Sequence, residues 1–211
     1  MEKSKCRVYS RFTVTRSDGS TVKLRIQDMP LEYLDAVVDM HSEYFTKDEP
    51  YHRAAGVYKS EHAKAESREL MKTALEHLQS HVDICCVDDD PDVIGELAGV
   101  SATHITNKTM DLGDIQNVEK FYDDLFILVH PDFRRLGIAK EFVKNRRTVC
   151  KLENIAVTAS WMSSWGTQKA GEQDGWQTVV VLCNEEIGKR FDVVFEDAPP
   201  TNKYMLTRVD Q

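Results

Sequence analysis

Residues 7–26 alternate between apolar and polar side chains on both sides of a short segment, 16–20. Alternation with a period of two is typical of strands with one buried face, and the Asp18-Gly19 pair inside the segment favours a turn. The pattern therefore predicts a β-hairpin near the start of the chain.

Two longer stretches repeat apolar residues at steps of three and four, which is the period of an α-helix. The first begins after Pro30 and reaches Pro50, where proline disfavours further helix. The second covers residues 59–80. Its apolar stripe consists of Leu70, Met71, Ala74, Leu75 and Leu78.

Strands and helices follow one another in the rest of the chain. Residues 82–87 and 93–105 predict two antiparallel strands, whereas residues 106–120 show no clear period. The continuous apolar run at 124–129 is typical of a strand buried on both faces. The remaining expected elements are a loop at 130–137, a helix at 138–150, a strand at 155–161, a helix at 163–174 that ends at Gly175, and strands at 176–182 and 204–209. This order predicts an α/β fold, in which helices pack on a mixed sheet, and one domain over residues 1–211.

Composition narrows the class of protein. Lys and Arg number 27 and Asp and Glu 35, and the resulting net charge of −8 repels nucleic acids and anionic membranes but attracts cationic small molecules. No apolar run reaches the roughly 20 residues of a membrane span, and no signal-peptide core follows the first residues, so we expect a cytoplasmic protein. The five cysteines are scattered and the seven histidines contain no His-Glu-x-x-His pair, so we expect neither a disulfide framework nor a metal site.

An anionic ligand would need a local basic segment, and one follows the buried strand at 124–129. The basic loop contains Arg134, Arg135 and Gly137 and leads directly into the helix at 138–150. A helix start presents free backbone N–H groups and the positive end of the helix dipole, which together bind anions such as phosphate. The spacing matches neither the Walker A pattern nor the dinucleotide pattern Gly-x-Gly-x-x-Gly.

The segment Arg134-Arg135-Leu136-Gly137-Ile138-Ala139 resembles the Arg/Gln-x-x-Gly-x-Gly/Ala motif of the GCN5-related N-acetyltransferase (GNAT) superfamily. The resemblance implies the GNAT fold, with a mixed, mostly antiparallel central sheet flanked by helices, and acetyl-CoA as cosubstrate. It also implies that the loop amides hold the CoA pyrophosphate and that the preceding strand pairs with the pantetheine arm. The implied cofactor-binding residues are Leu128, Val129, Arg134, Arg135, Leu136, Gly137, Ile138, Ala139 and Lys169.

Two further blocks resemble the insect-type arylalkylamine N-acetyltransferases. Phe45-Thr46-Lys47-Asp48-Glu49-Pro50 matches their Phe-x-x-Asp-Glu-Pro motif, in which the Glu is the general base. Ser163 and Thr167 match a pair of hydroxyl residues spaced by four, ahead of Gly175-Trp176, and Pro199-Pro200 and Met205 also agree. The resemblance implies Glu49, Ser163 and Thr167 as catalytic residues. Gly171 occupies the helix position at which many superfamily members carry a general-acid Tyr, so the general acid stays open.

Acetyl transfer to an amine sets chemical demands on these residues. An alkylamine has a pKa near 10.4 and is protonated at neutral pH, so a base must remove a proton before the nitrogen attacks. We expect Glu49 to do this with a pKa raised by partial burial. The amide of Val129 is the expected donor to the oxyanion, and Ser163 or Thr167 the donor to the leaving thiolate. The aromatic candidates for an amine pocket are Tyr44, Phe45, Tyr51, Tyr58, Trp161 and Trp165, although packing in the core is the commoner role for each of them.

The expected function is therefore direct transfer of acetyl from acetyl-CoA to a small primary arylalkylamine of the dopamine, tyramine, serotonin or tryptamine class. We expect this small amine to be the binding partner, and we expect the protein to bind neither nucleic acid nor membranes. We also expect a monomer. Two alternatives stay open on the sequence. One is acetylation of polyamines or other aliphatic amines, and the other is a non-catalytic module that binds acetyl-CoA.

Overall fold

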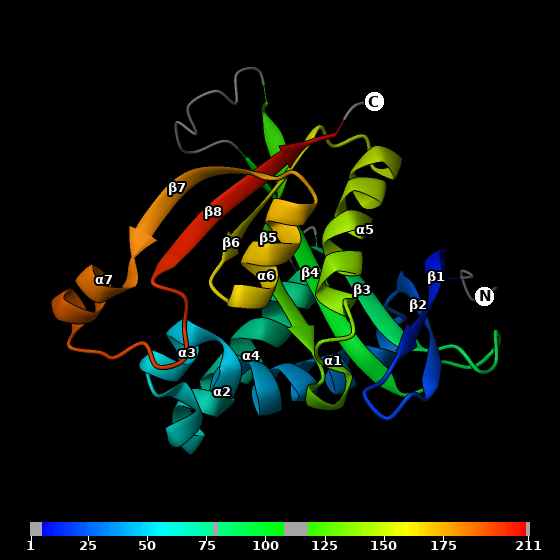
Figure 1. The fold of residues 1–211 in the computed structure, drawn as a ribbon, viewed down its shortest axis with the longest axis horizontal. Helices are drawn as coiled ribbons and strands as arrows, with labels where there is room; N and C mark the ends of the chain where they lie inside the picture. The colour runs from blue at the N-terminus through cyan, green and yellow to red at the C-terminus, as the bar shows by residue number, and fades with distance from the viewer. Residues whose placement is uncertain (1–5, 78–79, 108–117, 210–211) are drawn as a thin grey trace.

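The computed structural model describes residues 6–77, 80–107 and 118–209. In this part of the chain, eight strands form one sheet in the order β1-β2-β3-β4-β5-β6-β8-β7, and helices cover both faces (Figure 1). Neighbouring strands are antiparallel except for β5 and β6, which are parallel. The α/β fold with a mixed, mostly antiparallel sheet is thus confirmed.

The strands lie close to the positions that the alternating patterns predict. The expected hairpin is formed by β1 and β2, which pair from Val8↔Gln27 to Thr15↔Thr21 around Gly19, whose φ is 85°. Glycine adopts this left-handed conformation without the steric cost of a Cβ. The strand bounds are Val8–Thr15 (β1), Thr21–Asp28 (β2), Ser80–Val87 (β3), Leu97–Asn107 (β4), Lys120–Val129 (β5), Val157–Met162 (β6), Gln177–Cys183 (β7) and Thr201–Arg208 (β8).

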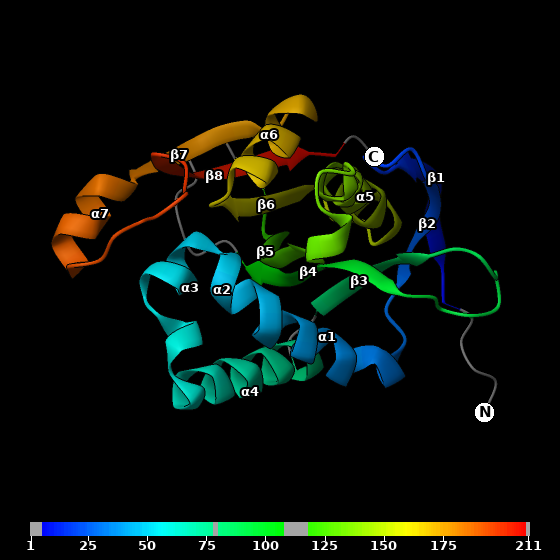
Figure 2. The same ribbon diagram turned by 60° about the horizontal axis from the view of Figure 1, so that its bottom comes forward.

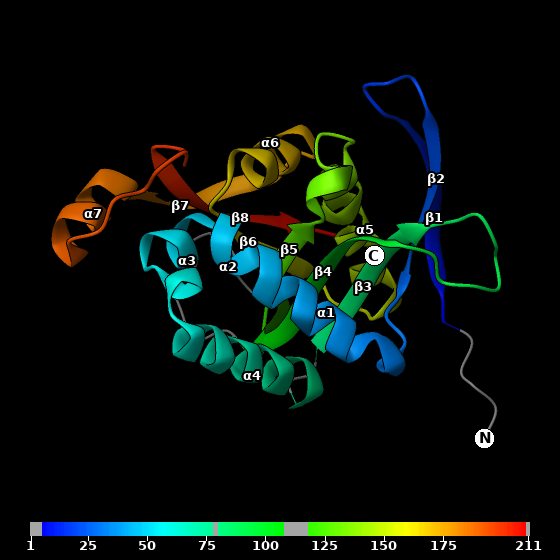
Figure 3. The ribbon, with the colours of Figure 1, turned by 90° about the horizontal axis from the view of Figure 1, so that it is seen from below.

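The helices form one layer on each face of the sheet. Helices α1 to α4 lie on one face, and α5 and α6 lie on the other (Figures 2 and 3). The α-helix bounds are Leu34–Met40 (α1), Thr46–Asp48 (α2), Pro50–Ala54 (α3), Glu61–His77 (α4), Ile138–Leu152 (α5), Trp165–Gln173 (α6) and Asn184–Phe191 (α7). Helix α5 buries the predicted stripe of Ile138, Phe142, Val143 and Val149. None of the described helices is long and apolar enough to cross a membrane.

The predicted helix after Pro30 is a series of segments. A 3-10 turn at Leu31–Tyr33 precedes α1, and a π-helical segment at His41–Phe45 joins α1 to α2. The chain then breaks at Glu49, whose ψ of 126° is extended. The helix thus ends before Pro50, as the sequence predicted. Pro50 then occupies the first position of a new helix, α3, which was not predicted. Proline fits this position because a first-turn residue needs no N–H partner within the helix.

Three further points differ from the sequence prediction or lie partly outside the described residues. Leu70, assigned above to an apolar stripe, is 71% exposed in α4, and Leu78, assigned to the same stripe, lies outside the described residues. Helix α7 follows β7 and was not predicted, because its eight residues are too few to establish a helical period. The unassigned region 106–120 contains the start of β5 at Lys120, and residues 108–117 lie outside the described part.

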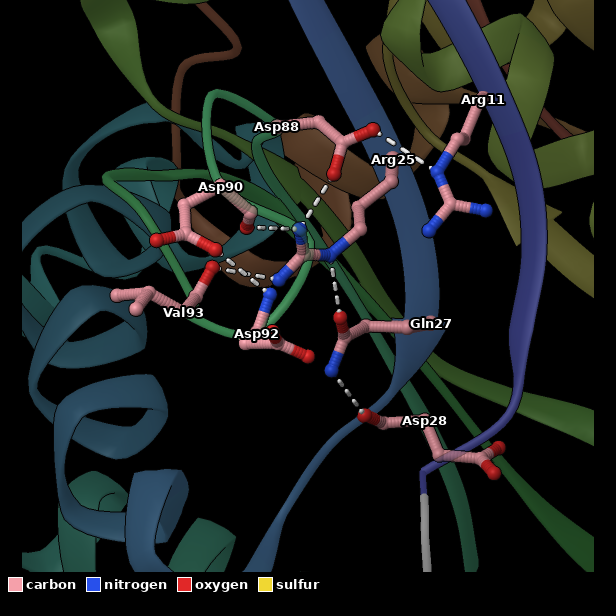
Figure 4. A network of polar contacts seen from close by, with 8 residues as sticks. All are labelled: Arg11, Arg25, Gln27, Asp28, Asp88, Asp90, Asp92 and Val93. Atoms are coloured by element: carbon pink, nitrogen blue, oxygen red, sulfur yellow. Dashed lines mark hydrogen bonds and ion pairs between the residues drawn. The ribbon is translucent and has the colours of Figure 1, made fainter.

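A buried arginine ties the β3–β4 loop to the sheet. Arg25 of β2 is 2% exposed. Its hydrogen-bond acceptors are Gln27, Asp88 and the backbone carbonyls of Asp90 and Val93, and Asp88 also accepts from Arg11 (Figure 4). A buried charge is tolerated only when it is paired and hydrogen-bonded, and this network meets that condition. The network therefore stabilises this end of the sheet.

Candidate active site

A cleft opens where β5 and β6 diverge. The two parallel strands pair at Tyr122↔Thr158, and beyond this pair β5 continues to Val129 with β4 as its partner on the other side. The cleft has a volume of about 730 Å³, which lies within the range of small-molecule sites. Its walls come from the junction of α2 and α3, the end of β5, the start of α5, and the end of β6 with α6.

The loop before α5 provides an anion site on one wall of this cleft. Arg135 and Gly137 adopt left-handed backbone conformations, with φ of 63° and 82°, and turn the chain into the helix. No side chain of the described residues caps α5 at Gly137, so the first-turn amides have no intramolecular helix partner. The side chains of Arg134, Arg135 and Lys140 line the cleft beside them. This combination of amides and cations suits a diphosphate.

The end of β5 presents backbone groups to the same cleft. The N–H of His130 donates to the carbonyl of Ala98 in β4 at 3.0 Å. Because hydrogen bonding alternates along an antiparallel pair, the N–H groups of Val129 and Ile127 point away from β4, toward the divergence of β5 and β6. The carbonyl of Val129 points the same way, since it accepts from Nε of Arg134 at 3.2 Å. Val129 therefore has the orientation required of the expected oxyanion donor, and Ile127 is a second donor that the sequence did not indicate.

Glu49 lies on the opposite wall, at the break between α2 and α3. Its side chain is 12% exposed, and its Oε2 accepts from the backbone N–H and the ring Nδ1 of His52, both at 2.8 Å. Burial raises the pKa of Glu49, but hydrogen bonds from His52 and from Ser163 outweigh burial and bring that pKa below its ordinary value. The expectation of a raised pKa is therefore wrong. The Glu49 carboxylate is therefore ionised at neutral pH.

Two other carboxylates that line the cleft have arginine partners. Asp48, the residue before Glu49, forms an ion pair with Arg134 across the cleft. Asp124 of β5 forms an ion pair with the buried Arg146 of α5. The arginines neutralise the charges of Asp48 and Asp124. Of the three described carboxylates that line the cleft, Glu49 alone has no ion pair with an arginine or lysine among the described contacts.

The two predicted hydroxyl residues have different partners. Ser163 follows β6 and lies close enough to Glu49 for its hydroxyl to lower the pKa of that carboxyl. Thr167, in the first turn of α6, has its Oγ1 at 3.0 Å from Oγ of Ser164, the N-cap residue of that helix. Both line the cleft. Ser163 is thus connected to the base, and Thr167 to the capping serine.

Gly171 does not face the cleft. A Cβ at this position would lie 2.6 Å from Sδ of Met162 and 3.3 Å from Sδ of Met205, in the core between α6 and the sheet. A side chain there would point into the core and could not reach the reacting groups. A side chain at position 171 would require the end of the Met162 side chain to shift, so the glycine reflects core packing and says nothing against catalysis.

Most of the aromatic residues expected in an amine pocket lie elsewhere. Phe45 and Trp161 line the cleft. Tyr51 instead donates to Asn184 at 2.8 Å and packs against Phe195. The expectation is also wrong for Tyr44, Tyr58 and Trp165, which are not among the lining residues.

Comparison with solved structures gives the fold its name. A putative arylalkylamine N-acetyltransferase 7 from the yellow fever mosquito, Aedes aegypti, matches with a TM-score of 0.82, 21% identity, and coverage of 99% of this chain and 98% of that one. Arylalkylamine N-acetyltransferase 2 from Aedes aegypti has a TM-score of 0.65, 16% identity, and coverage of 89% and 99%. The chain has the GNAT fold. An agmatine N-acetyltransferase is also similar, with a TM-score of 0.64, 8% identity, and coverage of 88% and 99%. No protein-family model and no curated protein matches the sequence.

On this GNAT fold, eleven of the twelve site residues expected from the sequence line one cleft. The exception is Leu136, whose side chain packs against a core cluster that includes Phe133 and Phe142. Their roles stay predictions. Among the residues of the site that sequence analysis missed are His52, Ile127 and Ser164. Of these, only Ser164 carried a recognisable signal, because serine before a helix is a preferred N-cap.

Proposed function

We propose that this protein is an acetyl-CoA-dependent N-acetyltransferase that acts on small arylalkylamines and belongs with the insect-type enzymes of that kind. One observation carries the proposal: the ionised carboxylate of Glu49 shares a cleft with the open edge of β5 and the uncapped start of α5. A base, a strand edge for a thioester arm and a diphosphate site are the groups that direct transfer to an amine requires. Holding both reactants in one cleft makes the reaction effectively unimolecular.

The diphosphate of acetyl-CoA fits the loop of Arg134, Arg135 and Gly137, where amides and cations converge. The pantetheine arm fits the unpaired edge of β5 at Ile127 and Val129, on either side of Leu128. Glu49 accepts a proton from the ammonium group of the substrate, directly or through water. Because the pKa of Glu49 is low, that proton passes on to solvent rather than staying on the base.

The remaining polar groups serve the thioester end. The N–H of Val129 stabilises the negative charge that develops on the thioester oxygen. The leaving thiolate, with a pKa near 8.5, needs only a weak donor. Ser163 lies beside Glu49 and lowers its pKa, whereas the hydroxyl of Thr167 contacts Ser164. We therefore assign the donor to the leaving sulfur to Thr167 and the stabilisation of the Glu49 carboxylate to Ser163.

The charges of the cleft favour an arylalkylamine over a polyamine. A polyamine needs a second carboxylate for its second cation, but Asp48 and Asp124 are already paired with arginines. Phe45 and Trp161 offer rings beside Glu49, and Trp161 is 36% exposed and so available for stacking.

A thiol-release assay with acetyl-CoA and a panel of amines tests this function. We expect kcat/KM for tyramine, dopamine, serotonin and tryptamine to exceed that for putrescine, spermidine and agmatine by about ten- to a hundredfold, because burial of a ring contributes roughly 1.5 to 3 kcal/mol. Equal or higher values for the aliphatic amines would overturn the arylalkylamine assignment. Binding of acetyl-CoA without acetylation of any amine would indicate the non-catalytic alternative.

A further inference from the structure

His52 holds the proposed base through two separate groups. Its backbone N–H and its ring Nδ1 both reach Oε2 of Glu49, each at 2.8 Å. Both contacts go to one oxygen, so Oε1 receives none from His52. The backbone contact caps α3 and is present whatever side chain stands at position 52. The ring contact depends on the imidazole, and the two contacts can therefore be separated by substitution.

Among the groups around the imidazole ring of His52, Glu49 is the principal charged partner. His52 packs edge-on against Phe45 at 5.2 Å and against His41 at 6.2 Å between ring centroids. His41 is fully buried, and burial, together with the charge of His52, lowers the pKa of His41 to about 3, so His41 is neutral at physiological pH. The other groups near the carboxylate are Ser163, the hydroxyl of Tyr51, and Asp48 with its arginine partner.

A buried carboxylate needs such partners if it is to act as a base. Without hydrogen-bond donors, burial favours the protonated form, which cannot accept a proton, and leaves the side chain free to rotate. His52 is 35% exposed, so its ring bridges the cleft-facing carboxylate and the solvent. The ring thus supplies both the donor and a connection to water.

We propose that His52 is a positioning residue for the reaction: its Nδ1–H fixes Oε2 of Glu49, so that the carboxylate stays in one orientation and presents Oε1 to the amine or to an intervening water. This inference rests on the proposed function, because it concerns the base of that reaction. His52 itself does not contact the reacting atoms, and it is absent from the residues that line the cleft.

Two substitutions separate this role from a structural one. His52→Asn keeps an N–H donor close to the position of Nδ1, whereas His52→Leu removes it at similar volume. A matched control is His62→Leu, which removes an exposed histidine, 83% accessible, that pairs with Glu66 in α4. Circular dichroism and Tm check that each variant is folded.

The primary measurement is the titration of the Glu49 carboxyl carbon by 13C NMR in the full-length protein, assigned with Glu49→Gln. We expect His52→Leu to raise the titration midpoint by about one pH unit, a tenfold change in the ratio of ionised to protonated carboxyl, while His52→Asn and His62→Leu stay near wild type. The pH profile of kcat/KM for tyramine should follow: the acidic limb moves up by the same amount in His52→Leu, kcat at a pH well below the midpoint falls about tenfold, and KM for acetyl-CoA is unchanged.

An unchanged midpoint in His52→Leu, or equal effects of Leu and Asn, would overturn the positioning role. The titration does not depend on turnover. If the wild-type protein acetylates no amine, the proposed function fails, and the NMR midpoint still decides whether His52 controls Glu49.

Discussion

Arg134, the first residue of the phosphate loop, forms an ion pair across the cleft with Asp48, the residue directly before the base. Both side chains are 41% exposed, so the pair contributes only about 0 to 1 kcal/mol to stability. The pair nevertheless joins the loop that would bind the diphosphate to the segment that carries Glu49. The guanidinium therefore has two competing partners, the carboxylate of Asp48 and a bound phosphate.

This competition predicts the effect of Asp48→Asn. Loss of the carboxylate frees Arg134 for the phosphate, so we expect Kd for CoA to fall about two- to fivefold, equivalent to breaking a surface ion pair of about 0.4 to 1 kcal/mol. Isothermal titration calorimetry measures this. The change should shrink in 0.5 M salt, which screens exposed charges. Weaker binding of CoA by Asp48→Asn would show that the pair organises the loop instead.

Gly137→Val should remove CoA binding. A Cβ at Gly137 meets no atom within 4 Å, but the φ of 82° is costly for any residue with a side chain, by about 1 to 2 kcal/mol. The valine methyl groups would occupy the space through which a phosphate reaches the amides of α5. We expect a small loss of Tm in the free protein and no increase of Tm on adding CoA. Gly137→Ala carries the same backbone cost with less bulk and should keep part of the increase, whereas full stabilisation of the valine variant would place CoA elsewhere.

Glu49→Gln should abolish most of the turnover. Glutamine keeps an oxygen that can accept from the His52 backbone and preserves the shape, but it cannot accept a proton. We expect kcat to fall by roughly 10²- to 10⁴-fold, with KM for acetyl-CoA unchanged. Glu43→Gln, at an exposed carboxylate paired with Lys47, is the control and should stay near wild type. A rate for Glu49→Gln within about threefold of wild type would assign proton removal to another group.

His41 should make the fold sensitive to acid. Its pKa is lowered to about 3 in the folded protein, chiefly by burial, and is near 6.5 in the unfolded chain. Between these values the unfolded chain binds more protons, so the free energy of unfolding falls as pH falls, by up to about 1.4 kcal/mol per pH unit. We expect His41→Phe to flatten this dependence between pH 6.5 and 4.5, above the range in which Glu49 titrates.

Urea denaturation at a series of pH values measures the effect. Both ring nitrogens of His41 are buried without a hydrogen-bond partner in the described structure, and the ring packs on Phe45 and Phe126. Phenylalanine should therefore be tolerated at pH 7. His62→Phe, at an exposed position, should leave the slope unchanged. An unaltered slope in His41→Phe would mean that another group carries the acid sensitivity.

Much of the fold could be predicted from local patterns. The alternation on both sides of Gly19 predicted β1 and β2, and the apolar stripe of Ile138, Phe142 and Val143 predicted α5, because strands and helices expose one face with a fixed period. The π-helical segment at His41–Phe45 could not be predicted. It changes the hydrogen-bonding register without changing the helical pattern of apolar positions.

In the candidate site, too, some features could be predicted from the sequence and others depended on the tertiary structure. The order of residues along the chain was enough to mark Glu49, the loop at Arg134 and Gly137, and Ser163 as candidates, because each motif is contiguous. Only the tertiary structure decided that Ser163 and His52 contact Glu49 and lower its pKa, that Gly171 faces Met162 in the core, and that Tyr51 faces Phe195 rather than the cleft. Burial and hydrogen-bond partners determine the charge state and the orientation of a side chain such as Glu49. These partners come from segments that are distant in sequence. The segments come together only in the folded protein, around the cleft where β5 and β6 diverge.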